Sequence, residues 1–69
     1  MPLSMVREGE ESIIRRIIGK TETRRFLYNL GFVEGGRVTV VNEMDGNIIV
    51  NVRDSRVAIG KDMANKIMV

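Results

Sequence analysis

Basic residues crowd into one short stretch of the chain, and they are its clearest candidates for binding another molecule. Between positions 15 and 25, five positive side chains accompany a single negative one, Glu22. The five are Arg15, Arg16, Lys20, Arg24 and Arg25. Such a cluster attracts nucleic-acid phosphates, anionic lipids and acidic proteins. The stretch contains no aromatic ring on which bases would stack. The simplest interpretation of the cluster is a solvated charged face. Among binding functions, contact with a protein partner is favoured over contact with nucleic acid.

The glycine-rich segment 31–36 (GFVEGG) is a second candidate site. Glycine-rich loops cradle phosphates when a Lys-Ser/Thr pair follows and opens a helix. Here the residues that follow, Arg37 to Glu43, favour a strand instead. We interpret the segment as a tight helix-to-strand connection, in which Gly31 caps the helix and Gly35 or Gly36 permits the turn.

Three carboxylates, Glu43, Asp45 and Asp54, lie near the expected hairpin ends and are the candidates for a metal site. Hard cations accept oxygen ligands, but ferrous and zinc sites normally add imidazole or thiolate. The chain contains no His and no Cys. We therefore interpret these residues as turn formers with at most a weak ion site, and we predict no dedicated metal site and no cofactor.

Catalysis is not expected either. Ser12, Tyr28, Ser55 and Lys61 carry nucleophilic or basic groups, but no spacing pairs a nucleophile with a base. Without His and Cys, the commonest bases and nucleophiles are missing. The sequence predicts a protein that is not an enzyme.

The composition is that of an ordinary globular domain. The chain has 69 residues, 43% of them hydrophobic and 29% charged, with a net charge of +2. This length predicts a single domain over residues 1–69. No apolar run is long enough to cross a membrane, and the first residues do not resemble a signal peptide. We expect a cytoplasmic protein.

One helix is predicted over residues 21–30. Thr23, Phe26, Leu27 and Leu30 fall at helical spacing and form one apolar face, which we expect to pack in the core. Thr21 is the expected N-terminal cap, and Glu22 suits the positive end of the helix dipole. Gly31 is the expected left-handed residue that ends the helix, so that Phe32 packs back on Leu27.

The remaining pattern predicts short strands. Asp45-Gly46 favours a two-residue hairpin turn, and Asp54-Ser55 is a second turn candidate. Residues 61–66 suit one helical turn. The predicted strands are 12–18, 37–43, 47–53, 56–59 and 67–69. A small chain buries one face of such a sheet best by curling it. The fold expected is mainly β, a small five-stranded SH3-like barrel with one helix inserted after the first strand and a short C-terminal helical turn.

Residues 24–35 (RRFLYNLGFVEG) resemble the signature of the FeoA family of bacterial ferrous iron transport. The family pattern is a basic stretch, then Leu-x-x-Leu-Gly, an apolar residue, and a Gly four positions after the first. Leu27, Leu30, Gly31, Phe32 and Gly35 fill these positions. The order of the other motifs extends the resemblance over the whole chain.

The resemblance implies an SH3-like barrel and a small cytoplasmic accessory protein of iron homeostasis. It also implies a protein partner, the FeoB membrane transporter with its cytosolic GTP-binding domain, with no nucleic acid and no insertion into the membrane. Transition-metal binding is described for the family as a whole. The expected partner-binding residues are on the helix and the glycine loop: Arg24, Arg25, Tyr28, Gly31, Val33 and Gly35.

Two other functions remain open at this point. One is a small basic β-barrel that binds nucleic acid through the same arginines; the other is a weak transition-metal-binding module. The apolar run Ile48-Ile49-Val50, placed near an edge of the barrel, would in addition allow weak self-association.

Overall fold

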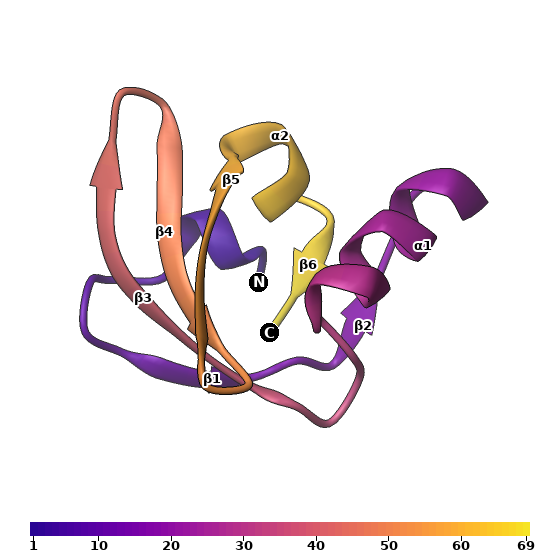
Figure 1. Ribbon diagram of the computed structural model, residues 1–69, viewed down its shortest axis with the longest axis horizontal. Helices are drawn as coiled ribbons and strands as arrows, with labels where there is room; N and C mark the ends of the chain where they lie inside the picture. Colours follow the sequence, from indigo (N-terminus) through magenta and orange to yellow (C-terminus); the bar gives the residue numbers. More distant parts are fainter.

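A computed structural model describes residues 1–69 as six short strands, two α-helices and one turn of 3-10 helix (Figure 1). In chain order the elements are η1 Leu3–Met5, β1 Glu11–Ile13, β2 Arg16–Ile17, α1 Thr21–Leu30, β3 Arg37–Met44, β4 Asn47–Val52, β5 Ser55–Gly60, α2 Lys61–Ala64 and β6 Ile67–Met68. The mainly β prediction is confirmed. The helix α1 has the predicted bounds, and α2 occupies most of the predicted C-terminal turn.

The strands form two separate sheets instead of a closed five-stranded barrel. One sheet has four antiparallel strands in the order β1-β3-β4-β5, and the other pairs β2 with β6. The predicted strand 12–18 divides because its backbone changes partners. The N–H of Ile14 donates to Gly36 O at 2.9 Å, and the next N–H, of Arg15, donates to Met68 O at 2.8 Å. One continuous segment of the chain thus contributes β1 to the first sheet and β2 to the second.

The helix α1 ends as predicted, but its first turn is not capped as predicted. Lys20, and not Thr21, precedes the first helical residue, and no side chain caps that end. At the other end Gly31 adopts φ 108°. Its N–H donates to Tyr28 O at 2.9 Å, and the N–H of Phe32 donates to Leu27 O at 3.0 Å. These two bonds are the Schellman pattern, which only a residue tolerant of positive φ permits.

Thirteen buried hydrophobic side chains form one core between the two sheets and α1. Leu27 and Phe32 are fully buried in it, and Leu30 is partly buried against it. The prediction that Phe26 packs in the core is wrong, because its side chain is 48% exposed. α1 lies at the outside of the molecule (Figure 1), so only a narrow stripe of the helix meets the core.

Two tight turns connect β3, β4 and β5. Asp45 and Gly46 both have positive φ, which confirms the first predicted turn. The second turn uses Arg53 and Asp54, at φ 51° and 61°, so the predicted turn at Asp54-Ser55 is displaced by one residue. β4 pairs with strands on both sides, which makes the expected edge position of Ile48–Val50 wrong.

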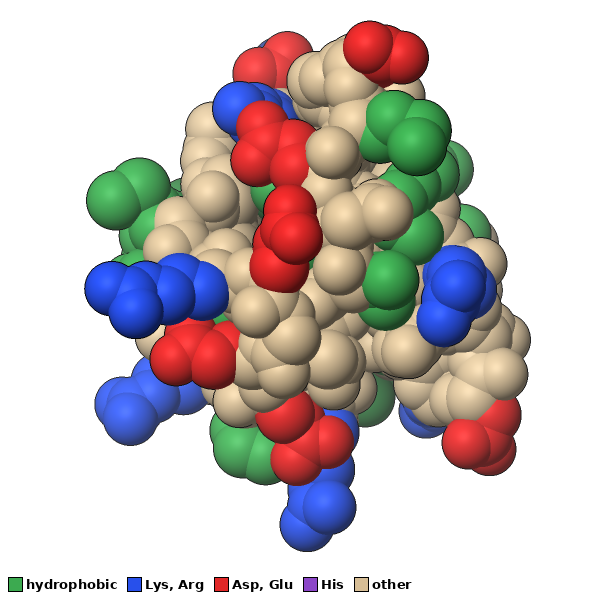
Figure 2. Space-filling model, turned by 90° about the vertical axis from the view of Figure 1, so that its left-hand side faces the viewer, with side chains coloured by type: hydrophobic (Ala, Val, Ile, Leu, Met, Phe, Trp, Pro, Cys, Tyr) green, Lys and Arg blue, Asp and Glu red, His purple; other side chains and the backbone are tan.

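The outer face of the larger sheet is rich in charge of both signs. Figure 2, which views the molecule from the side of β3, shows acidic side chains along the middle of this face and basic side chains toward its edges. Neither α1 nor α2 has the length and apolar character that spanning a membrane requires.

Candidate functional site

The exposed side of α1 carries a shallow groove built from residues one helical turn apart. Thr21, Arg24, Arg25 and Tyr28 line it, and its volume is about 350 Å³. The helix spacing places these side chains on one side because positions three and four residues apart are neighbours. The groove thus unites three of the six residues predicted to bind a partner.

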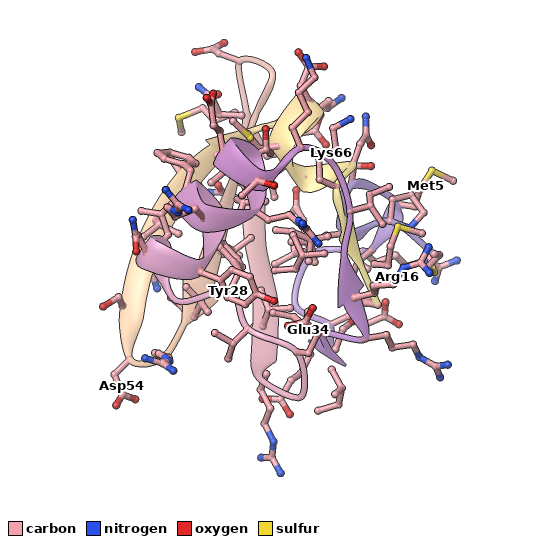
Figure 3. All side chains as sticks on the ribbon, turned by 90° about the vertical axis from the view of Figure 1, so that its right-hand side faces the viewer. Met5, Arg16, Tyr28, Glu34, Asp54 and Lys66 are labelled. Atoms are coloured by element: carbon pink, nitrogen blue, oxygen red, sulfur yellow. The ribbon has the colours of Figure 1, made fainter.

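The loop after the helix returns to this groove. The Tyr28 hydroxyl donates to Glu34 Oε1 at 2.5 Å, and Figure 3 shows the two side chains pointing toward each other. Gly31 makes the contact possible because its left-handed conformation reverses the chain. The bond links the helix face to the glycine loop as one surface.

This hydrogen bond moves the pKa of both groups in opposite directions. Donation from Tyr28 holds the pKa of Glu34 below its ordinary value, helped by the main-chain N–H groups of Glu34 and Ile17 and by Arg24. The same bond, desolvation and the negative charge of Glu34 raise the pKa of Tyr28, while Arg24 opposes the rise. At neutral pH the pair is therefore a neutral phenol bonded to a carboxylate.

The three loop residues predicted for partner binding differ in their surroundings. Gly31 is buried, Val33 is half-buried and Gly35 is exposed. The N–H of Gly35 donates to Ile14 O at 2.7 Å, which ties the loop to the end of β1. Gly31 therefore shapes the surface from beneath, and Val33 and Gly35 lie where a partner would reach them.

The basic cluster has no acidic partner of its own. The structure contains one ion pair, between Lys61 Nζ and Glu43 Oε1 at 2.5 Å, and it lies between α2 and β3. The guanidinium groups of Arg24 and Arg25 are exposed and unpaired. Arg16 and Lys66, in β2 and just before β6, lie on the same side of the molecule as Tyr28 (Figure 3). This side thus presents free positive charge, which acts at long range.

The three carboxylates considered for a metal site do not come together. Asp45 lies in the β3–β4 turn and Asp54 in the β4–β5 turn, at opposite ends of β4. Glu43 is engaged by Lys61. No three His, Cys, Asp or Glu side chains are grouped so that they could hold a metal ion. Both aspartates have positive φ, so their role as turn residues is confirmed.

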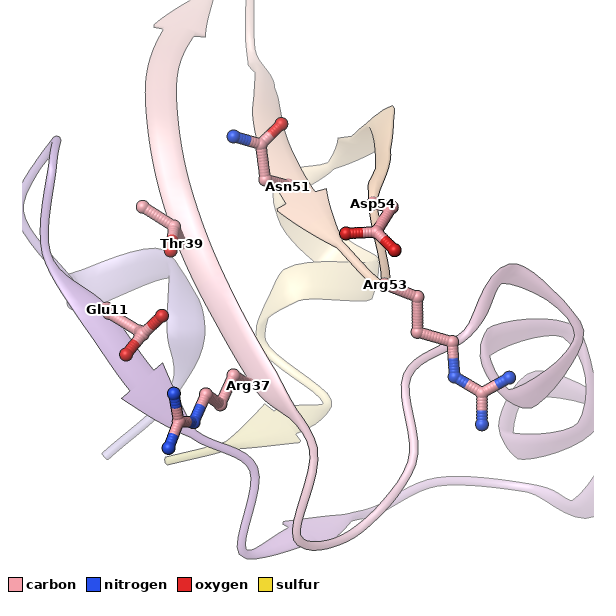
Figure 4. A pocket seen from close by; sticks show the side chains of 6 residues that line it. All are labelled: Glu11, Arg37, Thr39, Asn51, Arg53 and Asp54. Carbon is pink, nitrogen blue, oxygen red and sulfur yellow. The ribbon is translucent and has the colours of Figure 1, made fainter.

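A second hollow lies on the outer face of the larger sheet (Figure 4), with a volume of about 420 Å³. Its lining is polar and mixed in charge: Glu11, Arg37, Thr39, Asn51, Arg53 and Asp54. The Arg53 side chain runs toward α1 and away from the hollow (Figure 4). Both carboxylates and guanidinium groups belong to the residues of this hollow, whereas no acidic side chain lines the α1 groove.

Comparison with known proteins identifies the family of this chain. A family model for the FeoA domain matches residues 1–69. The chain belongs to the FeoA family. This FeoA-family protein is 34% identical over 68 residues to a protein of Methanocaldococcus jannaschii named Fe(2+) transport protein A. That match covers 99% of the chain and 83% of the relative. The family places the protein among the accessory proteins of ferrous iron transport.

Solved structures of FeoA proteins have the same fold. A crystal structure of an iron uptake regulatory protein, FeoA, is 33% identical with a TM-score of 0.93, covering 100% of this chain and 93% of that one. FeoA of Stenotrophomonas maltophilia, described as a prokaryotic SH3-domain protein in complex with zinc, has a TM-score of 0.87 at 24% identity. The match covers 100% of this chain and 88% of that one. The SH3-like character predicted for the fold is confirmed.

Two members of the site escaped prediction from the sequence. Thr21 was expected only to cap the helix, and Glu34 was expected only as part of a connecting loop. The signal that could have found Glu34 is Gly31, because a left-handed residue at a helix end directs the following residues back along the last turn.

Proposed function

We propose that this FeoA-family protein is a non-enzymatic accessory protein that binds the cytosolic part of a FeoB-like ferrous iron transporter, the part that carries the GTP-binding domain. The observation that carries the proposal is the exposed face of α1 in a protein of this family. Arg24, Arg25 and Tyr28 form one groove there, and the two arginines have no internal partner.

The parts of this face have different roles in the proposed contact. Arg24 and Arg25 supply long-range attraction and contacts at the rim, where charges set the association rate and the register. Tyr28, 40% exposed, and Val33 supply apolar area near the centre. Gly31 reverses the chain after α1, and the bond from Gly35 N–H to Ile14 O fixes the loop that carries Val33. A rigid small domain of this kind binds without a large ordering cost.

An accessory protein influences transport only if it distinguishes between states of its partner. A binder with equal affinity for two states shifts neither population. We therefore propose that the face binds one nucleotide state of the cytosolic GTP-binding domain more tightly than the other. In this proposal the partner performs the transport, and the two proteins contact each other on the cytoplasmic side of the membrane.

The test is a double charge reversal, Arg24→Glu with Arg25→Glu, and a binding titration against the purified cytosolic region of the transporter. Loss of two rim charges and gain of two repulsive ones is expected to weaken binding by more than about tenfold. The matched control is Arg7→Glu with Arg37→Glu, which makes the same change in net charge at exposed positions away from α1. We expect the control to bind within about twofold of the original protein.

Equal affinity of the α1 variant and the original protein would remove this face from the interface. Equal loss in both variants would show that net charge alone, and no particular surface, controls the binding.

A further inference from the structure

The groove on α1 has the chemistry of a carboxylate site. Thr21, Arg24, Arg25 and Tyr28 line it, so that two arginines lie at the groove and no acidic side chain does. A guanidinium group binds a carboxylate through two parallel hydrogen bonds, which makes arginine the preferred residue for recognising this group.

The chain's own carboxylate lies close to this groove but is held elsewhere. Glu34 is near enough to Arg24 for the arginine to lower its pKa, yet the two make no ion pair. Its Oε1 instead accepts the hydrogen bond from Tyr28. The loop around it is fixed by Gly35, whose N–H donates to Ile14 O, and by Gly36, whose N–H donates to Val33 O at 3.0 Å.

We propose that the groove binds a carboxylate side chain from an acidic segment of a partner protein, and that the Tyr28–Glu34 hydrogen bond keeps the groove free by holding Glu34 away from Arg24. Tyr28 is thus a positioning residue as well as a wall of the groove. Identifying the owner of the acidic segment with the iron transporter rests on the proposed function, whereas the carboxylate chemistry does not.

An acidic protein segment fits this surface better than nucleic acid does. Only Tyr28 and Phe26 are exposed aromatic residues on the helix, and the Tyr28 hydroxyl is already bonded. Base stacking normally needs successive aromatic platforms along a basic groove.

The first experiment measures binding of a hexaglutamate peptide at low ionic strength, with hexaglutamine as the uncharged control. The original protein is expected to bind hexaglutamate and not hexaglutamine. The variant Arg24→Gln is expected to bind hexaglutamate about tenfold more weakly. In Tyr28→Phe, Glu34 loses its hydrogen bond and becomes free to pair with Arg24. That variant is expected to bind several-fold more weakly.

The decisive variant is the double change Tyr28→Phe with Glu34→Gln. Removing the competing carboxylate restores affinity to within about twofold of the original protein if the proposal holds. A simple loss of structure or of contact by Tyr28 would not be rescued in this way. Unchanged circular dichroism of all variants is the control for folding.

Three results would overturn the proposal: full affinity in Tyr28→Phe, no recovery in the double variant, or an oligonucleotide or anionic vesicle that binds as tightly as hexaglutamate. The proposal and the proposed function fail separately. If the peptide binds with the expected pattern but the transporter's cytosolic region does not bind, only the identity of the partner is refuted. Transporter binding without peptide binding would sink only the carboxylate site.

Discussion

The side-chain stem of Arg53 lies directly against Gly31, the residue that ends α1. A Cβ atom placed on Gly31 would be 3.3 Å from Arg53 Cδ and 3.7 Å from Val52 Cγ2. The turn between β4 and β5 is thereby packed on the end of the helix. The φ of 108° at Gly31 disfavours any other residue, and a Cβ there would also require the Arg53 side chain to shift by a few tenths of an ångström.

Gly31→Ala is expected to destabilise the protein by about 2 kcal/mol, because the left-handed conformation and the contact with Arg53 both oppose a Cβ. Gly9→Ala is the matched control. Gly9 also has positive φ, at 84°, but nothing lies within 4 Å of the added atom. It should cost only about 1 kcal/mol. Urea unfolding of both variants measures the difference, and equal values would show that the Arg53 contact contributes nothing.

Leu27→Asp is expected to abolish the folded state. Leu27 is fully buried, so the change removes core contacts and leaves a charge without a partner, at a cost above about 4 kcal/mol. Phe26→Asp, one residue earlier on the exposed side of α1, should cost less than about 1 kcal/mol. Thermal unfolding followed by circular dichroism compares them. A cooperative transition in Leu27→Asp near the original temperature would contradict the core assignment.

The ionisation of Tyr28 reports the bond to Glu34 directly. The chain has one Tyr and no Trp, so the rise in absorbance near 295 nm on deprotonation belongs to this residue alone. The midpoint should lie above the ordinary pKa of 10.0, because the hydrogen bond to Glu34 favours the neutral phenol. Glu34→Gln should move the pKa of Tyr28 back toward that value, and Glu22→Gln should leave it unchanged.

The same pair links stability to pH at both ends of the scale. The pKa of Glu34 is lowered on folding, so its contribution is present above about 4.5 and is lost as pH falls through the folded value. The pKa of Tyr28 is raised, so its contribution is present below 10.0 and is lost as pH rises through the folded value. Urea unfolding is measured at about pH 3 and about pH 7. The difference between the two urea midpoints should be smaller in Glu34→Gln than in the original protein. An identical pH profile in the two proteins would contradict the bond.

The free edge of β5 provides a test of the strand register. The two-residue turn at Arg53–Asp54 makes Val52 and Ser55 a hydrogen-bonded pair, so Val57 also bonds to β4 while the N–H of Ala58 points away from it. Ala58→Pro should therefore be tolerated within about 1 kcal/mol, whereas Val57→Pro should cost about 3 kcal/mol or more. Denaturant unfolding measures both. The reverse ranking would mean that the register is shifted by one residue.

Local chemistry made parts of this fold predictable. The bounds of α1 and the left-handed Gly31 depend on residues within one turn of each other, and so does the turn at Asp45-Gly46. The break between β1 and β2 was not predictable, because Ile14 and Arg15 take their partners from Gly36 and Met68, both distant in sequence. The prediction that Phe26 packs in the core was wrong for a related reason. Helical spacing defines an apolar face, but only the tertiary arrangement decides how much of that face is covered.

The candidate site divides in the same way. Arg24, Arg25 and Tyr28 share a groove because helix geometry alone places them together. The bond from Tyr28 to Glu34 crosses the end of the helix, and its formation depends on how the loop returns after Gly31. The carboxylates Asp45 and Asp54 were predicted to be turn residues, and both lie in tight turns, at opposite ends of β4.

The pairing of β2 with β6 has a kinetic consequence. It joins Arg16 to Met68 and Ile17 to Ile67, segments from nearly opposite ends of the chain, through only two residues on each side. Closing so long a loop costs entropy that so short a ladder does not offset by itself. The meander of β3, β4 and β5 needs only two tight turns and is free to assemble first. We therefore predict that the small sheet closes after the meander during folding.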